Sequence, residues 1–99
     1  MRRVARHVVA DLIFDEHNER EMARHGVVRY DVEQIQWNRN VVVPNRRGEP
    51  GSVLLIGETD GGRLLTVPLA PTDDPTTWRP ATAFDADRHQ RWLFDRRYR

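Results

Sequence analysis

The side chains best suited to chemistry in this sequence are its arginines and one histidine. The 16 strongly basic positions are all arginine, because the chain contains no lysine. A guanidinium group makes bidentate hydrogen bonds to phosphate or carboxylate, so each arginine is a candidate ligand for such a group. A compositional bias explains the absence of lysine equally well, and the position of each arginine therefore has to decide its role.

Arg46 and Arg47 stand in a loop rich in glycine and proline, where two adjacent cations could approach a phosphate backbone. An ordinary solvated loop is the simpler interpretation of this pair. His25 stands just before Gly26 at the end of a predicted helix, and its imidazole could serve as a general base. The same position also suits a histidine that only stabilises the carboxyl end of the helix.

Several familiar types of site are excluded by the residues themselves. The chain contains no cysteine, which excludes disulfides and thiolate metal sites. It also lacks a phosphate-binding glycine loop, a serine–histidine–acid set and the ligand spacing of a zinc site. His17 and His25 are two helical turns apart, roughly 12 Å, which is too far to share one metal ion. We therefore expect neither a metal nor a cofactor.

Two helices are expected in the first half of the chain. Asp15 is a typical N-cap residue, and acidic residues follow it, as the amino end of a helix favours. Gly26 would end this first helix in the left-handed conformation. Apolar residues at helical spacing predict a second helix over 29–37.

Most of the remaining chain has the pattern of strands. Strands are predicted over 8–14, 41–43, 53–58, 63–69 and 78–84. The sequence Asp60-Gly61-Gly62 between two apolar runs is a strong hairpin signal. Pro68 and Pro80 lack the N–H that a sheet ladder uses, so each is expected at an edge, a bulge or a strand end.

A third helix is expected after the last strand, with Asp85 as its N-cap. His89 and Trp92 fall on the apolar side of this helix, so both are assigned to the core. Trp37 and Trp78 are also assigned to the core, although an exposed indole can stack on a nucleic-acid base.

These elements predict one α+β domain over 1–99, with a small antiparallel sheet, about three helices and the order β-α-α-β-β-β-β-α. Only 38% of the residues are hydrophobic, which favours an oligomer or a bound partner. The apolar runs are too short to span a bilayer, and the basic amino terminus makes a poor signal peptide. We therefore expect a cytoplasmic protein that has no contact with membranes.

Four short motifs follow one another along the chain. They are Phe14-Asp15-Glu16-His17-Asn18, Ala23-Arg24-His25-Gly26-Val27, Gly61-Gly62-Arg63-Leu64-Leu65-Thr66-Val67 and Trp78-Arg79-Pro80-Ala81-Thr82-Ala83. In this order and combination the sequence resembles the BrnT family of toxins. The resemblance implies a RelE-like fold, ribonuclease activity and a cognate antitoxin.

The implied activity would give the basic residues specific tasks. Cleavage of RNA at its 2′-hydroxyl needs a proton acceptor, a cation on the phosphate and an acid for the leaving oxygen. Arg63 and Arg79 are the candidate catalytic cations and His25 is the candidate base, while Arg46 and Arg47 are candidate RNA-binding residues. We expect Arg63 and Arg79 to point toward one concave surface. The alternative is a pair of surface arginines on the sheet, or arginines buried against acids of the first helix.

Two functions remain open on this evidence. The first is a toxin-like, metal-independent endoribonuclease that is inhibited by a small antitoxin. The second is a catalytically weakened module that binds RNA or protein on the same scaffold, and Phe84 favours it because the family motif has an arginine there. The expected assembly is a homo-oligomer or a toxin–antitoxin hetero-oligomer. An acidic antitoxin is expected to contact the last helix near Arg91, Trp92, Phe94, Arg96 and Arg97.

Overall fold

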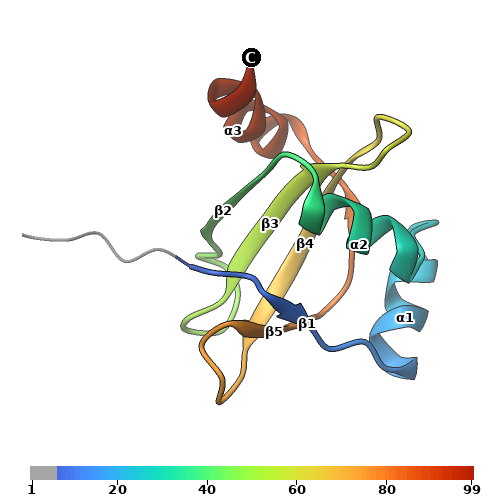
Figure 1. The fold of residues 1–99 in the computed structure, drawn as a ribbon, viewed down its shortest axis with the longest axis vertical. Coiled ribbons are helices and arrows are strands. Elements are labelled where there is room, and N and C mark those ends of the chain that lie inside the picture. The colour runs from blue at the N-terminus through green and yellow to red at the C-terminus, as the bar shows by residue number, and fades with distance from the viewer. Residues whose placement is uncertain (1–6) are drawn as a thin grey trace, which may run out of the picture.

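A computed structural model describes residues 7–99 as a mixed fold of helices and strands (Figure 1). Its elements in chain order are β1 (Asp11–Leu12), α1 (Glu16–Ala23), α2 (Arg29–Trp37), β2 (Asn40–Pro44), β3 (Val53–Glu58), β4 (Leu64–Pro71), β5 (Thr77–Pro80), β6 (Phe84–Asp85) and α3 (Arg88–Tyr98). The predicted α+β class is confirmed. The predicted order is also confirmed, with the last strand divided into β5 and β6.

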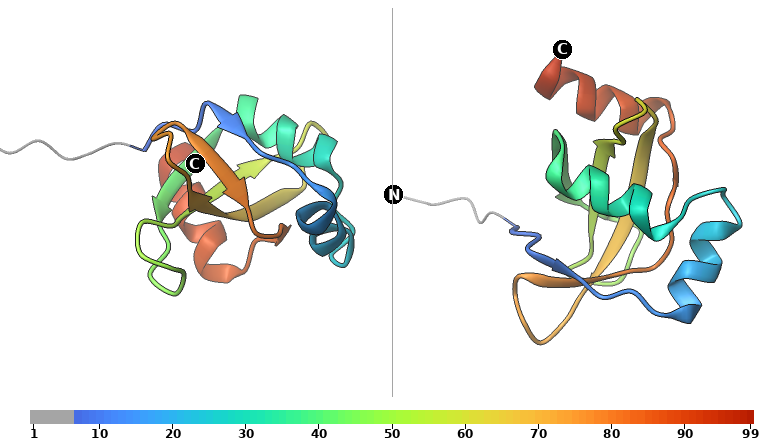
Figure 2. Two further views of the ribbon diagram at one scale, coloured as in Figure 1. Left: turned by 90° about the horizontal axis from the view of Figure 1, so that it is seen from below. Right: turned by 45° about the vertical axis from the view of Figure 1, so that its right-hand side comes forward.

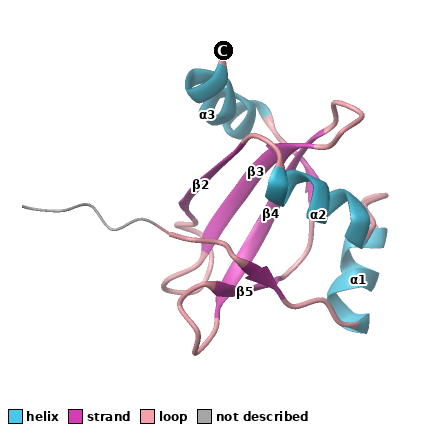
Figure 3. Ribbon diagram, in the orientation of Figure 1, coloured by secondary structure: helices cyan, strands magenta, loops and turns pink. Residues whose placement is uncertain are grey.

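All the strands belong to one sheet, whose order is β1-β5-β4-β3-β2, with β6 also paired to β4 (Figure 3). The pairs are antiparallel except for β1, which runs parallel to β5. Pro68 lies where β4 exchanges one neighbour for another, since β6 pairs with Thr66 and β5 with Leu69. Its carbonyl accepts from Ala81 on this side, so its missing N–H falls between the two short ladders and leaves the β3–β4 ladder continuous.

The centre of the sheet is the hairpin of β3 and β4. Its register runs from Val53 opposite Leu69 to Glu58 opposite Leu64. The predicted turn closes this hairpin, with the amide of Gly62 donating to the carbonyl of Thr59 at 2.9 Å. Gly62 has a φ of +89°, a conformation that glycine adopts without a steric penalty.

The two faces of the sheet carry separate apolar clusters. Leu55, Leu65 and Val67 pack beneath α1 and α2, whereas Ile56 and Leu64 pack against Phe94 of α3. Figure 2 shows α2 and α3 on opposite sides of the sheet. The first two helices thus cover the same face of the sheet. Since α3 lies at one end of the other face (Figure 1), part of that face is left without a helix.

The first helix begins and ends as the sequence predicts. Asp15 and Asn18 form a reciprocal capping box, with each side chain accepting from the other backbone amide at 2.8 and 2.9 Å. The buried Asn18 also donates to the carbonyl of Ile13 at 2.9 Å. Beyond the helix, Gly26 has a φ of +68°, as its predicted role requires.

Three predicted boundaries are wrong. The first strand has only two residues, Asp11 and Leu12, which pair with Thr77 and Trp78. The last strand is interrupted after Pro80, where the amide of Ala81 donates to the carbonyl of Pro68. Asp85 does not cap α3, because its carboxylate pairs with Arg63, and Asp87 caps the helix instead.

Several aromatic assignments are also wrong. Trp78 is buried as expected, but Trp37 is 79% exposed and Trp92 is 52% exposed. His89 is exposed as well. The helix α3 buries Phe94, and a residue two positions earlier lies about 200° around the helix axis, so Trp92 faces away from the sheet. In residues 7–99 no helix is long and apolar enough to cross a membrane.

Candidate nucleic-acid interface

The arginines of the described chain divide into two groups according to their partners. Seven of the thirteen in residues 7–99 lie within 4.0 Å of a carboxylate oxygen. The other six have no carboxylate partner among these residues. They are Arg46, Arg47, Arg88, Arg91, Arg96 and Arg97.

All six unpaired arginines belong to two segments. Arg46 and Arg47 stand in the loop between β2 and β3, and the other four stand on α3. The loop is held by Asn45, whose side-chain oxygen accepts from the amide of Arg47 at 3.2 Å. The backbone amide of Asn45 donates to the carbonyl of Ser52 at 2.9 Å, and this hydrogen bond joins the two ends of the loop. The two cations are therefore presented by a loop with fixed ends.

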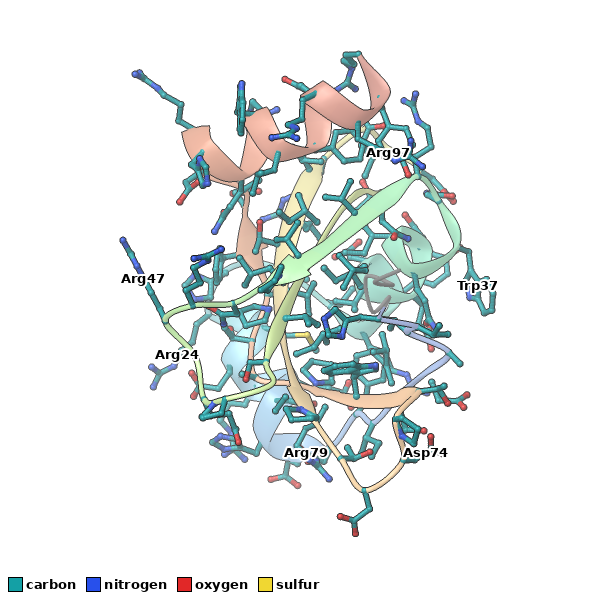
Figure 4. All side chains as sticks on the ribbon, turned by 90° about the vertical axis from the view of Figure 1, so that its left-hand side faces the viewer. Arg24, Trp37, Arg47, Asp74, Arg79 and Arg97 are labelled. Carbon is teal, nitrogen blue, oxygen red and sulfur yellow. The ribbon has the colours of Figure 1, made fainter. Side chains whose placement is uncertain are left out.

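A groove of about 800 Å³ lies between the loop and the helix. Its floor is the uncovered part of the sheet face, formed by Val43, Leu54 and Pro68. Arg46 and Arg47 line one side of the groove, and Figure 4 shows Arg47 extending outward from the loop. This arrangement combines an apolar floor with a cationic rim.

The opposite wall is α3, which contributes His89, Gln90 and Leu93, and His89 also belongs to a column of three side chains along this helix. The rings of His89 and Trp92 are stacked, with centroids 5.8 Å apart and planes 19° from parallel. The guanidinium of Arg96 lies over the Trp92 ring at 4.9 Å. His89 and Arg96 flank Trp92 from opposite directions along the helix, and of these three side chains only His89 lines the groove.

The groove contains little negative charge. Asp87 is the one carboxylate among its described lining residues. Its Oδ1 accepts from the amide of Gln90 at 2.8 Å, and Gln90 accepts in turn from the buried Thr66 hydroxyl at 2.9 Å. Asp87 is thus held in its capping role, and the arginines dominate the electrostatics of the groove.

Two of the predicted catalytic residues, Arg63 and His25, are brought together. The guanidinium of Arg63 donates to the carbonyl oxygens of Gly26 at 2.7 Å and His25 at 2.9 Å. Its Nε also donates to Oδ1 of Asp85 at 2.7 Å. This hydrogen bond raises the pKa of Arg63 and lowers the pKa of Asp85. Each nitrogen of the Arg63 guanidinium therefore has a protein partner, and the side chain ties the α1–α2 junction to the sheet.

The imidazole of His25 reaches the edge of the groove. It contacts Phe84 edge to face, with centroids 5.9 Å apart, and Phe84 lines the groove. Arg91 and His25 both act on the Asp85 carboxylate, lowering its pKa in addition to the larger effect of Arg63. An exposed histidine and an unpaired guanidinium thus lie around one carboxylate at this end of the groove.

Arg79 lies elsewhere. It stands opposite Ala70 in the register, on the sheet face that also carries Pro68, and its guanidinium is paired with Asp15. Arg63 contacts the α1–α2 junction on the other face, so the two arginines are not brought to one concave surface. The pKa of Asp15 is lowered, first by the amide of Asn18 and then by the charge of Arg79.

The sequence alone assigned Arg88, His89 and Gln90 to no site, and it placed Arg91 only in the contact with an antitoxin. The available signal was the terminal run of arginines over 88–99, in which Asp95 is the only acid. Residues 7–99 contain no group of three or more His, Cys, Asp or Glu side chains placed to hold a metal ion. Comparison with protein-family models, curated proteins and solved structures finds no match to the chain.

Proposed function

We propose that this protein binds single-stranded RNA in the groove between the β2–β3 loop and α3. The observation that carries the proposal is the location of the unpaired cations. All six arginines that lack a carboxylate partner in residues 7–99 stand on the two segments that flank this groove. An unpaired guanidinium keeps its donors free for phosphate oxygens, and neutralising phosphates is the main source of affinity for nucleic acids.

The groove also suits unpaired bases. An incoming base can extend the column of Trp92 and His89 by stacking on the outer face of His89, above the apolar floor of Leu54 and Pro68. The bases of a duplex are stacked on each other and cannot enter such a groove without being unpaired. Single-stranded RNA is therefore the favoured ligand.

A toxin-like scaffold of the BrnT type, with a RelE-like fold, is part of the same proposal. The four motifs support it, as does the element order of one strand, two helices, five strands and a final helix. A small acidic antitoxin would bind the same arginines and displace the RNA in the cytoplasm. The antitoxin would contact Trp92 and the exposed arginines, because Phe94 is completely buried.

A second function, metal-independent cleavage of RNA, is favoured by the position of His25 at the end of the groove. In that reaction His25 accepts the proton of a 2′-hydroxyl, the 2′-oxygen attacks phosphorus, and the 5′-oxygen leaves with a proton from an acid. Arg91 is the unpaired cation for this chemistry, because it acts on the same Asp85 carboxylate as His25, whereas each guanidinium nitrogen of Arg63 already has a protein partner. Arg63 then acts as a positioning residue.

The binding proposal is tested by fluorescence anisotropy with a labelled single-stranded RNA and its duplex. We expect the single strand to bind more tightly, and the double variant Arg46→Ala/Arg47→Ala to bind it at least tenfold more weakly. The control is Arg20→Ala/Arg24→Ala, which removes two exposed arginines of α1 that pair with glutamates. Equal losses of RNA affinity in the two double variants would show that the affinity depends on net charge, and would overturn the proposal that RNA binds in the groove.

Cleavage is tested separately by incubating the pure protein with total RNA, with and without a chelator. Fragments that form in both reactions and disappear in His25→Ala support the nuclease. RNA binding without any fragments would show that the protein is a catalytically weakened module, which binds RNA and does not cleave it.

A further inference from the structure

The helix α2 presents an aromatic face that no part of the described chain covers. Trp37 is 79% exposed and Tyr30 is 65% exposed, and these residues are seven positions apart, which places them on the same side of the helix. Figure 4 shows Trp37 extending from the end of α2 on the side of the molecule opposite Arg47. Tryptophan and tyrosine are the residues most often found as energetic anchors of protein interfaces.

Beside these aromatics lies a cavity of about 570 Å³ between α2 and β1. Leu12 and Phe14 contribute its apolar wall, and Tyr30 and Trp37 line the side formed by α2. Gln36 fixes the two walls together, because its Nε2 donates to the carbonyl of Ala10 at 2.7 Å. Since β1 is a terminal strand of the sheet, the cavity opens beside a strand edge.

The charges around this cavity are opposite in sign to those of the arginine groove. Its lining has three carboxylates, Asp11, Glu33 and Asp60, against one guanidinium. That guanidinium belongs to Arg29, which pairs with Glu33 at 3.1 Å and lies over the Phe14 ring at 4.7 Å. Asp11 and Asp60 have no cationic partner within residues 7–99, so the lining has an excess of two negative charges.

One of these carboxylates is held in place. The Asp60 side chain accepts from Nδ2 of Asn38 at 2.9 Å, and the Asp60 amide donates to Gln34 of α2 at 2.8 Å. The rim therefore presents an ordered acceptor next to the exposed indole of Trp37. Ordered acceptors and rigid aromatic rings lose little conformational entropy when a partner binds.

We propose that this cavity docks a cationic, extended segment of a partner protein. An apolar side chain of the segment inserts between Trp37 and the wall of Leu12 and Phe14. Arginine or lysine side chains on either side of this anchor meet Asp11 and Asp60. The segment follows β1, as in the addition of a peptide strand to a sheet edge. The proposal is independent of RNA binding, since the cavity and the arginine groove lie on opposite sides of the sheet and have opposite charge.

The test selects a displayed library of random eight-residue peptides on the full chain, with a parallel selection on Trp37→Ala. Trp92→Ala is the matched control, because it removes the other exposed tryptophan from the opposite side of the sheet. Enriched peptides are then synthesised, and their affinities for each variant are measured by calorimetry at low and high salt. Circular dichroism checks the fold of each variant.

We expect peptides with at least two arginines or lysines around a large apolar residue. Their affinity should fall about tenfold or more in Trp37→Ala and in Asp60→Asn, fall with salt, and stay unchanged in Trp92→Ala. Acidic or uncharged peptides whose binding is lost in Trp37→Ala, or the absence of any peptide that depends on Trp37, would overturn the proposal. It would also be overturned by sedimentation that shows a dimer of the free chain that Trp37→Ala dissociates, because the occupant would then be a second copy.

Discussion

The Nε of Arg63 donates to Oδ1 of Asp85 at 2.7 Å and so joins positions that are 22 residues apart in the sequence. The same guanidinium binds the carbonyl oxygens of His25 and Gly26, where α1 turns into α2. Arg79 pairs with Asp15 at the other end of α1. Both ends of α1 are thus fastened to the sheet by arginines that the sequence suggested for catalysis.

This arrangement predicts that Arg63 contributes to stability. Arg63→Ala removes the hydrogen bonds to Asp85 and to two carbonyl oxygens, and we expect the free energy of unfolding to fall by about 1 to 2 kcal/mol. Urea titration followed by circular dichroism measures the change. The control is Arg20→Ala, whose ion pair with Glu16 is fully on the surface and should contribute less than about 0.5 kcal/mol. Similar values for the two variants would show that Arg63 is not a structural tie.

Acid should weaken the same contact. The hydrogen bond from Arg63 lowers the pKa of Asp85. A carboxylate with a lowered pKa in the folded state stabilises the protein above its unfolded pKa of about 3.9, and this stabilisation is lost as pH falls through the lowered folded pKa. The stability difference between the native protein and Asp85→Asn should therefore be constant near neutrality and shrink below about pH 4.

Urea titrations at several pH values measure this difference. Asp73→Asn is the control, because Asp73 is exposed and has no ion-pair partner among the described residues. A difference between Asp85→Asn and the native protein that persists unchanged to pH 3 would contradict the assignment.

The salt dependence of RNA affinity should report on the β2–β3 loop. If Arg46 and Arg47 each contact one phosphate, their joint replacement by alanine should reduce the slope of log affinity against log salt by roughly 1.4. Anisotropy titrations over a range of potassium chloride concentrations measure the slope. A slope that is unchanged, with affinity reduced, would mean that the loop acts without direct phosphate contact.

The column of His89, Trp92 and Arg96 on α3 should contribute to the affinity for single-stranded RNA and not to the affinity for a duplex. Trp92→Ala removes the support for His89 and should weaken binding of a single strand by about 1 to 3 kcal/mol, the usual contribution of one stacked base. Trp92→Phe keeps a ring and should retain most of the affinity. Binding to the duplex should be the same in all three proteins, and an equal loss for the duplex would argue against base stacking.

His25 should separate cleavage from binding. If the protein cleaves RNA, His25→Ala should slow cleavage by about 10²- to 10⁴-fold, the usual contribution of a general base. Its RNA affinity should stay within a factor of about two, because the unpaired arginines remain. Denaturing gels with an end-labelled RNA measure the rate. Cleavage at the native rate in His25→Ala would exclude this histidine as the base.

Local sequence determined the elements whose signals act over a few residues. The capping box of Asp15 and Asn18, the left-handed Gly26 and the turn at Asp60-Gly61-Gly62 each depend on short-range chemistry. The same holds for the bounds of α2 and β3, where apolar spacing alone marks the element. The alternation of side chains along a strand likewise places Arg79 on the sheet face opposite Trp78, and the register agrees.

Only the tertiary structure decided which charged side chains are free. An arginine looks the same in the sequence whether it meets Asp85 across the sheet, as Arg63 does, or meets no carboxylate in the described chain, as Arg46 does. Exposure was decided in the same way, since the sheet buries Ile35 whereas Trp37, two positions later on α2, points away from it. Ion pairing and burial depend on distances between residues far apart in the chain, and these distances are set by the packing of helices on the sheet.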